Sequence, residues 1–182
     1  MEITDRFRYG LGNFLLNRKI GKSTRKKQVI NLEEAKSVVI IYNVTGEERF
    51  NIIKKTAKAL SNSNRQVMIL GYIHGHTIPD YCVAANAGYF FNRKSINWLG
   101  LPKSDYLLQF IKKPFDILMD FTTEDFIVTR YLAGLSNARL KTGSFSQSNQ
   151  TYLDVMIEAD PRKSYEYYIE QTLHYLKLLK RY

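Results

Sequence analysis

The sequence predicts an α/β fold of three layers, in which helices cover a Rossmann-like, mostly parallel sheet of about five strands. After residue 36, short apolar runs of strand length alternate with segments of helical periodicity, a pattern typical of parallel sheets with crossover helices. A basic helical arm comes first. We therefore expect an arm over residues 1–36 and a single Rossmann-like domain over residues 37–182, and the 45% of hydrophobic residues suffices for a buried core.

The first half of the expected domain contains two strands and a helix with clear patterns. SVVIIYN (37–43) is rich in β-branched residues, which predicts a strand buried on both faces. Apolar residues over 50–60 recur every three or four positions and predict a helix, and QVMILGYI (66–73) predicts the second strand. The next segment is irregular, with a short helix expected over 79–87 and a short strand over 89–91.

The second half continues the alternation. A helix over 104–112 is expected to lead into a third buried strand, FDILMDF (115–121). Residues 123–136 have helical periodicity, and short strands are expected over 138–143 and 152–159.

The chain then ends in a helix with a clear start signal. Asp160 is expected to cap this helix, with Pro161 in its first turn. Between the last two helices, the polar composition of SFSQSNQ (144–150) predicts a flexible loop. The inward stripe of the last helix is expected to consist of Tyr165, Tyr168, Ile169, Thr172, Leu176 and Leu179.

Ligands of open α/β sheets bind beyond the carboxyl ends of the strands, so the loops after residues 43, 73 and 120 are the first places to look for a site. In the first loop, Thr45 and Glu48 have the spacing of a capping box, which would occupy the free N–H groups of the helix start. In the third loop, Thr122 and Asp125 are expected to cap the next helix. Capped, acidic helix starts argue against a phosphate-binding loop.

Metal and catalytic chemistry are weakly represented. His74 and His76 follow the second strand, with Asp80 nearby, but no adjacent His or Cys completes a zinc-type ligand set. We expect no metal, no cofactor and no catalytic residue. Cys82 lies in an apolar setting, where a buried thiol is expected, and a single cysteine fits a reducing cytoplasm.

The positive charge is concentrated at the N-terminus. The first 28 residues carry +6 of the net charge of +10, and such an arm commonly contacts nucleic-acid phosphates or an anionic membrane; a solvated tail is the alternative without function. A second basic patch precedes Trp98, which is expected to anchor its loop on the core, although stacking on a base is an alternative. The predicted nucleic-acid-binding residues are Arg6, Arg8, Arg18, Lys19, Lys22, Arg25, Lys26, Lys27, Arg93 and Lys94.

Several segments resemble an uncharacterised, Rossmann-like α/β protein family of Bacteroidetes bacteria. They are SINWLGLPKS, FDILMDFT followed by YLAGLSNARLKTG, and the closing YLDVMIEAD and YYIEQTLHYLK. The resemblance spans most of the chain, including the arm. It implies an α/β fold and a cytoplasmic location but brings no activity.

A more local similarity concerns FDILMDFTTEDFIVTRYLAGLSNARLKTG (115–143). This stretch is similar to one in the N-terminal half of heptosyltransferase-type glycosyltransferases, YDLVIDLQG…LARLSGAKRRVG. The similarity implies a Rossmann-like strand–helix–strand unit. The activity does not transfer, because those enzymes need a second domain for the sugar nucleotide, for which 182 residues leave no room. Thr122, Thr123 and Glu124 also replace the glycine-bearing turn.

Together, these features predict a non-enzymatic, RNA-associated protein that binds the ribosome or another ribonucleoprotein through its arm. One alternative is an enzyme or sensor that binds a nucleotide or sugar nucleotide at the strand ends. The other is an adaptor for a membrane surface or a partner protein, with an apolar helical face formed by Phe7, Leu11, Phe14 and Leu15. No apolar run has the length of a transmembrane segment.

Overall fold

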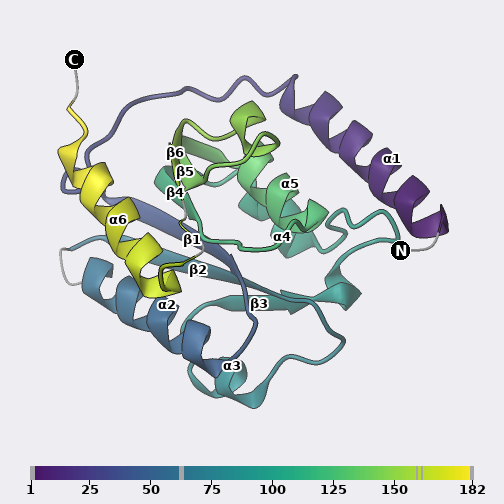
Figure 1. Ribbon diagram of the computed structural model, residues 1–182, viewed down its shortest axis with the longest axis horizontal. Helices are drawn as coiled ribbons and strands as arrows, with labels where there is room; N and C mark the ends of the chain where they lie inside the picture. Colours follow the sequence, from purple (N-terminus) through teal and green to yellow (C-terminus); the bar gives the residue numbers. More distant parts are fainter. Residues whose placement is uncertain (1–2, 62–63, 159, 161, 181–182) are drawn as a thin grey trace.

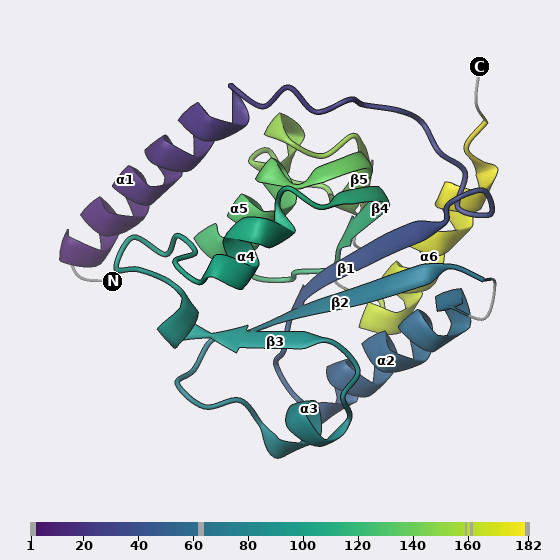
Figure 2. The same ribbon diagram turned by 180° about the vertical axis from the view of Figure 1, so that it is seen from behind.

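A computed structural model of the chain describes residues 3–61, 64–158, 160 and 162–180, without the side chains of residues 3–6. The described residues form a six-stranded, all-parallel sheet, one strand more than the approximate number predicted. The strands are β1 (Ser37–Asn43), β2 (Gln66–Ile73), β3 (Tyr89–Asn92), β4 (Pro114–Asp120), β5 (Asn137–Ser144) and β6 (Val155–Ile157). Their spatial order is β3-β2-β1-β4-β5-β6 (Figures 1 and 2). The connections therefore reverse direction between β1 and β4, which is the switch point where α/β proteins bind ligands.

Helices cover both faces of the sheet, as predicted. They are α1 (Ile3–Ile20), α2 (Glu47–Ser61), α3 (Asp80–Ala84), α4 (Asp105–Phe110), α5 (Ile127–Leu135) and α6 (Tyr165–Leu178), with short 3₁₀ turns at Arg93–Ser95 and Asn149–Thr151. Helices α2 and α6 cover one face, and α4 and α5 cover the other. Helix α1 lies alongside α5, on the side away from the sheet (Figure 1).

Strand β1 is buried on both faces, which confirms the prediction from its β-branched run. Its side chains from Val38 to Tyr42 are fully buried. Ile40 and Tyr42 belong to the core beneath α2 and α6, whereas Val39 and Ile41 belong to the core beneath α4 and α5. The apolar stripe predicted for residues 50–60 is likewise buried in the first of these cores.

Helix α1 forms as predicted, but its predicted apolar face is wrong. Phe7 and Phe14 are 69% and 63% exposed, and Leu11 and Leu15 are half-buried. The side chain that enters the core is Leu16, which packs against Ile127 and Tyr131.

The glycine content of α1 explains which face packs. A Cβ atom on Gly12 would lie 2.6 Å from the carbonyl oxygen of Leu99. Gly12 therefore permits a close approach that a larger residue would block, and the helix turns Phe7 and Phe14 outward. Helix periodicity alone did not reveal this, because it counts apolar residues and does not register where a small residue is required.

A segment that we call the strap, residues 21–36, runs from α1 across the amino ends of the strands to α6 (Figure 2). The Asn31 amide donates to the carbonyls of Lys177 and Leu179, and the Leu32 N–H donates to Leu176, so the strap satisfies the end of α6. Leu32 is itself buried in the core. The division into arm and domain at residue 36 stays a prediction, but the arm packs on the domain along its length.

The guanidinium of Arg65 holds the second half of the strap. It is buried and donates to the carbonyls of Leu32 and Ala35 in the strap, and to that of Leu60 at the end of α2. Three carbonyl acceptors thus replace water around a buried cation.

Two predicted helix starts are wrong. Helix α6 begins at Tyr165, and Ser164 caps it by accepting from the Tyr167 N–H; Asp160 instead accepts from Arg162, and Pro161 lies outside the described residues. Helix α5 begins at Ile127, four residues later than predicted. Helix α5 starts later than predicted because the residues expected to cap it form other hydrogen bonds in the preceding loop.

In that loop, the Thr122 N–H donates to Asp120 Oδ1 and the Thr123 N–H donates to Asn43 Oδ1. Thr122 and Asp125 therefore do not cap α5. The expected capping box at Thr45 does not form either, since its side chain makes none of the hydrogen bonds seen among the described residues. The acidic first turn of α2 remains.

We expect Gly12→Ala to lower the free energy of unfolding by about 1–3 kcal/mol, because the added methyl group must displace α1 from the Leu99 carbonyl. Gly10 provides the matched control, since nothing lies within 4 Å of a Cβ atom built there. Gly10→Ala should therefore stabilise the protein by about 1 kcal/mol through helix propensity. Urea denaturation of both variants measures the difference, and equal effects would contradict the close packing.

Candidate functional site

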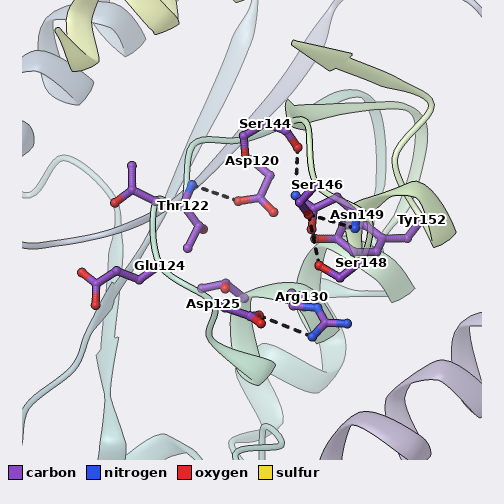
Figure 3. Close-up of a pocket in the computed structure, with 12 residues that line it drawn as sticks. Asp120, Thr122, Glu124, Asp125, Arg130, Ser144, Ser146, Ser148, Asn149 and Tyr152 are labelled. Carbon is purple, nitrogen blue, oxygen red and sulfur yellow. Dashed lines mark hydrogen bonds and ion pairs between the residues drawn. The ribbon is translucent and has the colours of Figure 1, made fainter. Parts of the chain in front are cut away.

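A polar cavity of about 220 Å³ opens at the carboxyl ends of β4 and β5, beside the switch point (Figure 3). All twelve residues that line it carry polar side chains. They are Asp120, Thr122, Thr123, Glu124 and Asp125 from the end of β4 and the following loop, Thr129 and Arg130 from α5, and Ser144, Ser146, Ser148, Asn149 and Tyr152 from the end of β5 and the region that follows it.

Asp120 is the acidic group at the base of this cavity. It ends β4, is 5% exposed and accepts from the Thr122 N–H at 3.1 Å. Burial raises the pKa of its carboxyl group to about 6, although hydrogen bonds from Thr122 act in the opposite direction. The group is therefore mostly ionised at pH 7 while almost excluded from bulk solvent.

Arg130 supplies the basic group. Its side chain is 9% exposed, and its Nη1 donates to Asn13 Oδ1 at 2.7 Å and to Asp125 Oδ1 at 3.4 Å. Its Nε is buried and has no hydrogen-bond partner among the described residues. Asp125 also accepts from the Tyr9 hydroxyl, so two side chains of α1 hold the wall of the cavity.

The loop after β5, predicted to be flexible, is organised by hydrogen bonds. Asn149 donates to the Ser144 carbonyl and accepts from the Tyr152 hydroxyl, while Ser146 and Ser148 bond to each other at 3.1 Å (Figure 3). Its hydroxyl groups consequently line the cavity opposite Asp120.

A second cavity, of about 540 Å³, lies at the carboxyl end of β2. His74 is stacked on Phe126, and Tyr72 packs edge-on against the same ring. Trp98 lines this cavity and is 62% exposed, so the expectation that it anchors its loop on the core is wrong. The loop is held instead by the Asn97 side chain, which accepts two backbone N–H groups.

The described residues contain no group of three or more His, Cys, Asp or Glu side chains arranged to hold a metal ion. Cys82 is buried, as predicted, and burial raises the pKa of its thiol to about 11. Among the helices that the structure describes, none has the length and apolar character needed to cross a membrane.

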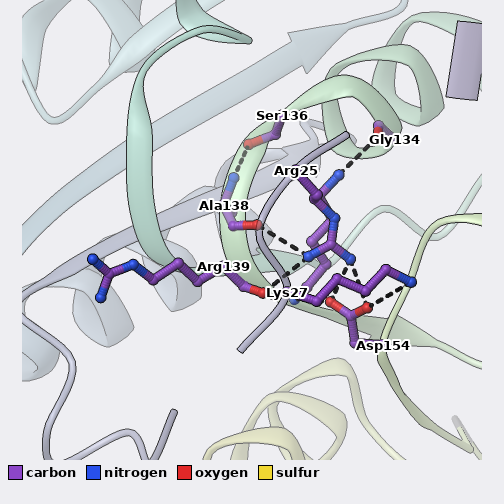
Figure 4. Close-up of polar contacts among 8 residues, drawn as sticks. Arg25, Lys27, Gly134, Ser136, Ala138, Arg139 and Asp154 are labelled. Atoms are coloured by element: carbon purple, nitrogen blue, oxygen red, sulfur yellow. Dashed lines mark hydrogen bonds and ion pairs between the residues drawn. The ribbon is translucent and has the colours of Figure 1, made fainter. Parts of the chain in front are cut away.

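The predicted nucleic-acid-binding residues fall into three groups, of which the first is occupied within the fold. Arg25 forms two hydrogen bonds of 2.6 Å with Asp154 and also donates to the Ala138 and Arg139 carbonyls (Figure 4). Lys19 donates to the Tyr131 hydroxyl. Arg25 is therefore a structural residue that fastens the strap to the start of β5.

The same cluster contains a buried lysine. Lys141 is fully buried and donates through Nζ to the Gly134 carbonyl at 2.7 Å. Burial, with the charge of Arg25 acting in the same direction, lowers its pKa to about 7. The Lys141 backbone N–H donates to Asp154, so Asp154 accepts hydrogen bonds from Arg25 in the strap and from the backbone of β5.

The second group lies at the carboxyl edge of the sheet. Arg93 and Lys94 are exposed in the turn after β3, and Arg93 lines the second cavity together with the half-buried Arg8. Arg93 therefore lies near the N-terminal half of the arm, at the edge of the sheet opposite the strap. The Arg6 side chain lies outside the described residues.

The third group is exposed at the opposite edge of the sheet, near the amino ends of the strands. Five of its cations come from the arm, and three cations of the domain lie at the same edge. We call this set the amino-edge basic surface. Its residues are Arg18, Lys22, Lys26, Lys27, Lys36, Lys112, Lys113 and Arg139.

The family assignment follows from a comparison with known proteins. A family model described as "Family of unknown function (DUF6913)" matches residues 11–179. The chain belongs to this family. The DUF6913 match spans the strap, the polar cavity and all six described strands, in line with the predicted membership of a family without an assigned activity. No curated protein matches the chain.

Sequence reasoning missed several residues of the polar cavity in this DUF6913 protein. Arg130 was placed within a helix without a role, and Ser146 and Ser148 were placed in a flexible loop. The available signal was an arginine inside an otherwise apolar helical segment, IVTRYLAGL. A cation at that position requires hydrogen-bond acceptors, which Asn13 and Asp125 provide.

We expect Arg25→Ala to lower the free energy of unfolding by about 3 kcal/mol, because it removes both short hydrogen bonds to the largely buried Asp154 and leaves only the exposed Lys27, at 3.5 Å, as its cationic partner. Lys26→Ala, one residue away and exposed, should change it by no more than about 0.5 kcal/mol. Equal losses in chemical denaturation would contradict a structural role specific to Arg25.

We also expect Asp120 to make stability depend on pH. Folding raises the pKa of its carboxyl group from 3.8 to about 6, so the folded state binds this proton more tightly than the unfolded state does. The resulting stabilisation is complete below about pH 4 and is lost as the pH rises through 6. The total change is about 3 kcal/mol. Between pH 4 and 7, the free energy of unfolding of the wild type should therefore fall relative to that of Asp120→Asn, measured under the same conditions. Parallel profiles would refute it.

Proposed function

We propose that this protein binds RNA through the amino-edge basic surface, in the cytoplasm and in association with the ribosome or another ribonucleoprotein. The observation that carries the proposal is that exposed cations from the arm adjoin exposed cations from the domain. A binding surface of this kind neutralises successive phosphates of one strand and needs no catalytic group.

The contacts of the strap support the continuity of this surface. The Gln28 N–H donates to the Arg139 carbonyl at 3.1 Å, which places Lys27 beside the start of β5. Arg139 pairs with Asp116 at 3.4 Å, and Asp116 also accepts from the Lys36 N–H at 2.8 Å. The arm, the start of β5 and the start of β1 therefore meet at one edge.

The acidic residues of the chain lie mostly elsewhere. Helices α2, α3 and α4 begin at the carboxyl edge with Glu47, Glu48, Asp80 and Asp105 in their first turns. Acidic residues stabilise helix starts and basic residues stabilise helix ends through the helix dipole, which accounts for the acids at that edge and for single lysines at helix ends. It does not account for Lys22, Lys26 and Lys27, which lie in the strap beyond the end of α1, and this supports a ligand for them.

We expect RNA binding to weaken about 10³-fold between 50 and 200 mM salt, as for a protein that neutralises about six phosphates. The triple variant Lys22→Gln/Lys26→Gln/Lys112→Gln should reduce the slope of log affinity against log salt by about two for a single strand. Fluorescence anisotropy with labelled single-stranded RNA measures both quantities.

The matched control is Lys54→Gln/Lys103→Gln/Lys163→Gln, which removes the same charge from exposed positions in the middle of α2 and before the starts of α4 and α6. It should retain most of the affinity. If both triple variants bind alike, the amino-edge basic surface is not the RNA site. Sedimentation of cell lysate, with and without RNase, then tests association with ribosomal particles: a protein that stays at the top of the gradient would contradict it.

A second candidate rests on the outward face of α1. Phe7 and Phe14 lie seven residues apart, so they share one face of the helix, and both are largely exposed. Insertion of these rings into an anionic membrane surface, or into the groove of a partner protein, is the corresponding function. Flotation with anionic vesicles that is abolished by Phe14→Glu, together with RNA binding that is insensitive to the triple variant, would favour it.

A further inference from the structure

The polar cavity at the ends of β4 and β5 has a composition that restricts its ligand. None of the residues that line it is aliphatic, and only Tyr152 contributes a ring. Its volume of about 220 Å³ is below the range of roughly 300–1,000 Å³ that holds drug-sized ligands. The cavity therefore suits a small polar molecule, or one residue of a larger one, and not a nucleobase or an acyl chain.

Two buried charged groups define what such a ligand must offer. Asp120, ionised, only accepts hydrogen bonds, and Arg130 only donates them. The Arg130 side chain is more than nine-tenths buried, and its Nε lacks a partner among the described residues. A buried donor of this kind costs free energy unless a ligand or water satisfies it.

The charges that line the cavity argue against an anion, and its ligand set argues against a metal ion. The charge of Arg130 is already matched by Asp125, whose Oδ1 lies 3.4 Å from Nη1. Asp120 and Glu124 then leave the cavity with a net negative charge, which disfavours a phosphate or a carboxylate. A metal cation is disfavoured by the buried guanidinium and by the lack of a ligand cluster among the described residues.

We propose that this cavity binds a neutral polyhydroxylated molecule, either a free monosaccharide or the terminal sugar of a glycan. A hydroxyl group donates one hydrogen bond and accepts two, so one sugar satisfies Asp120 and Arg130 together. Ser146, Ser148 and Asn149 line the other side of the cavity and exchange hydrogen bonds with further hydroxyl groups (Figure 3). The site is independent of the RNA-binding surface at the opposite edge.

The test uses the full chain and saturation-transfer NMR with D-glucose, D-mannose, D-galactose and D-ribose, with inorganic phosphate and glycine as ionic comparison ligands. At least one sugar should bind, and Asp120→Asn should weaken it about tenfold or more, since an ionised acceptor is lost. Asp80→Asn, an exposed acid outside the cavity, should bind like the wild type. Competition by an oligosaccharide ending in the same sugar distinguishes a glycan end from a free sugar.

Ser146→Ala/Ser148→Ala serves as a second variant if Asp120→Asn does not fold, because both serines are only half-buried; it too should weaken the sugar. Three outcomes overturn the proposal: binding of phosphate or glycine in place of sugars, sugar binding unchanged in the cavity variants, or no binding of any sugar. The variant Lys22→Gln/Lys26→Gln/Lys112→Gln should bind the sugar like the wild type. The RNA proposal and the sugar proposal can therefore fail independently of each other.

Discussion

Burial of the central strand β1 on both faces is the constraint from which the rest of the architecture follows. A strand with Val38 to Tyr42 fully buried needs helices above and below it. Parallel neighbours reach it only through crossovers, and right-handed crossovers to the two sides of β1 place α2 on one face and α4 and α5 on the other. The order of the strands then reverses between β1 and β4, and the polar cavity opens next to this point, at the ends of β4 and β5.

All-parallel connectivity also gives the two edges of the sheet different characters. Every crossover helix begins at the carboxyl edge and ends at the amino edge, so acids that complement helix starts collect at one edge and lysines at the other. The arm adds to this polarity because α1 runs alongside α5 in the same direction, from the Tyr9–Asp125 contact to the Lys19–Tyr131 contact. The strap then continues along the amino edge.

The arm therefore connects the two candidate surfaces. Tyr9 and Asn13 of α1 hold Asp125 and Arg130 in the wall of the polar cavity. Arg25, at the other end of the arm, fastens the strap through Asp154, which lies next to the buried Lys141. A residue predicted to contact phosphate thus acts in the fold, while its neighbours Lys26 and Lys27 remain exposed to a ligand.

Local patterns in the sequence determined the fold class, the central strands and the helices of strong period, such as the buried stripe of α2, because strand and helix periods depend only on neighbours along the chain. Tertiary structure decided whatever depends on partners far away in sequence. Gly12 selects the face of α1 through its approach to Leu99, and Asn43 draws the loop after β4 away from a local cap. Arg130 is held in the wall of the cavity because Asn13, more than a hundred residues earlier, accepts a hydrogen bond from its guanidinium.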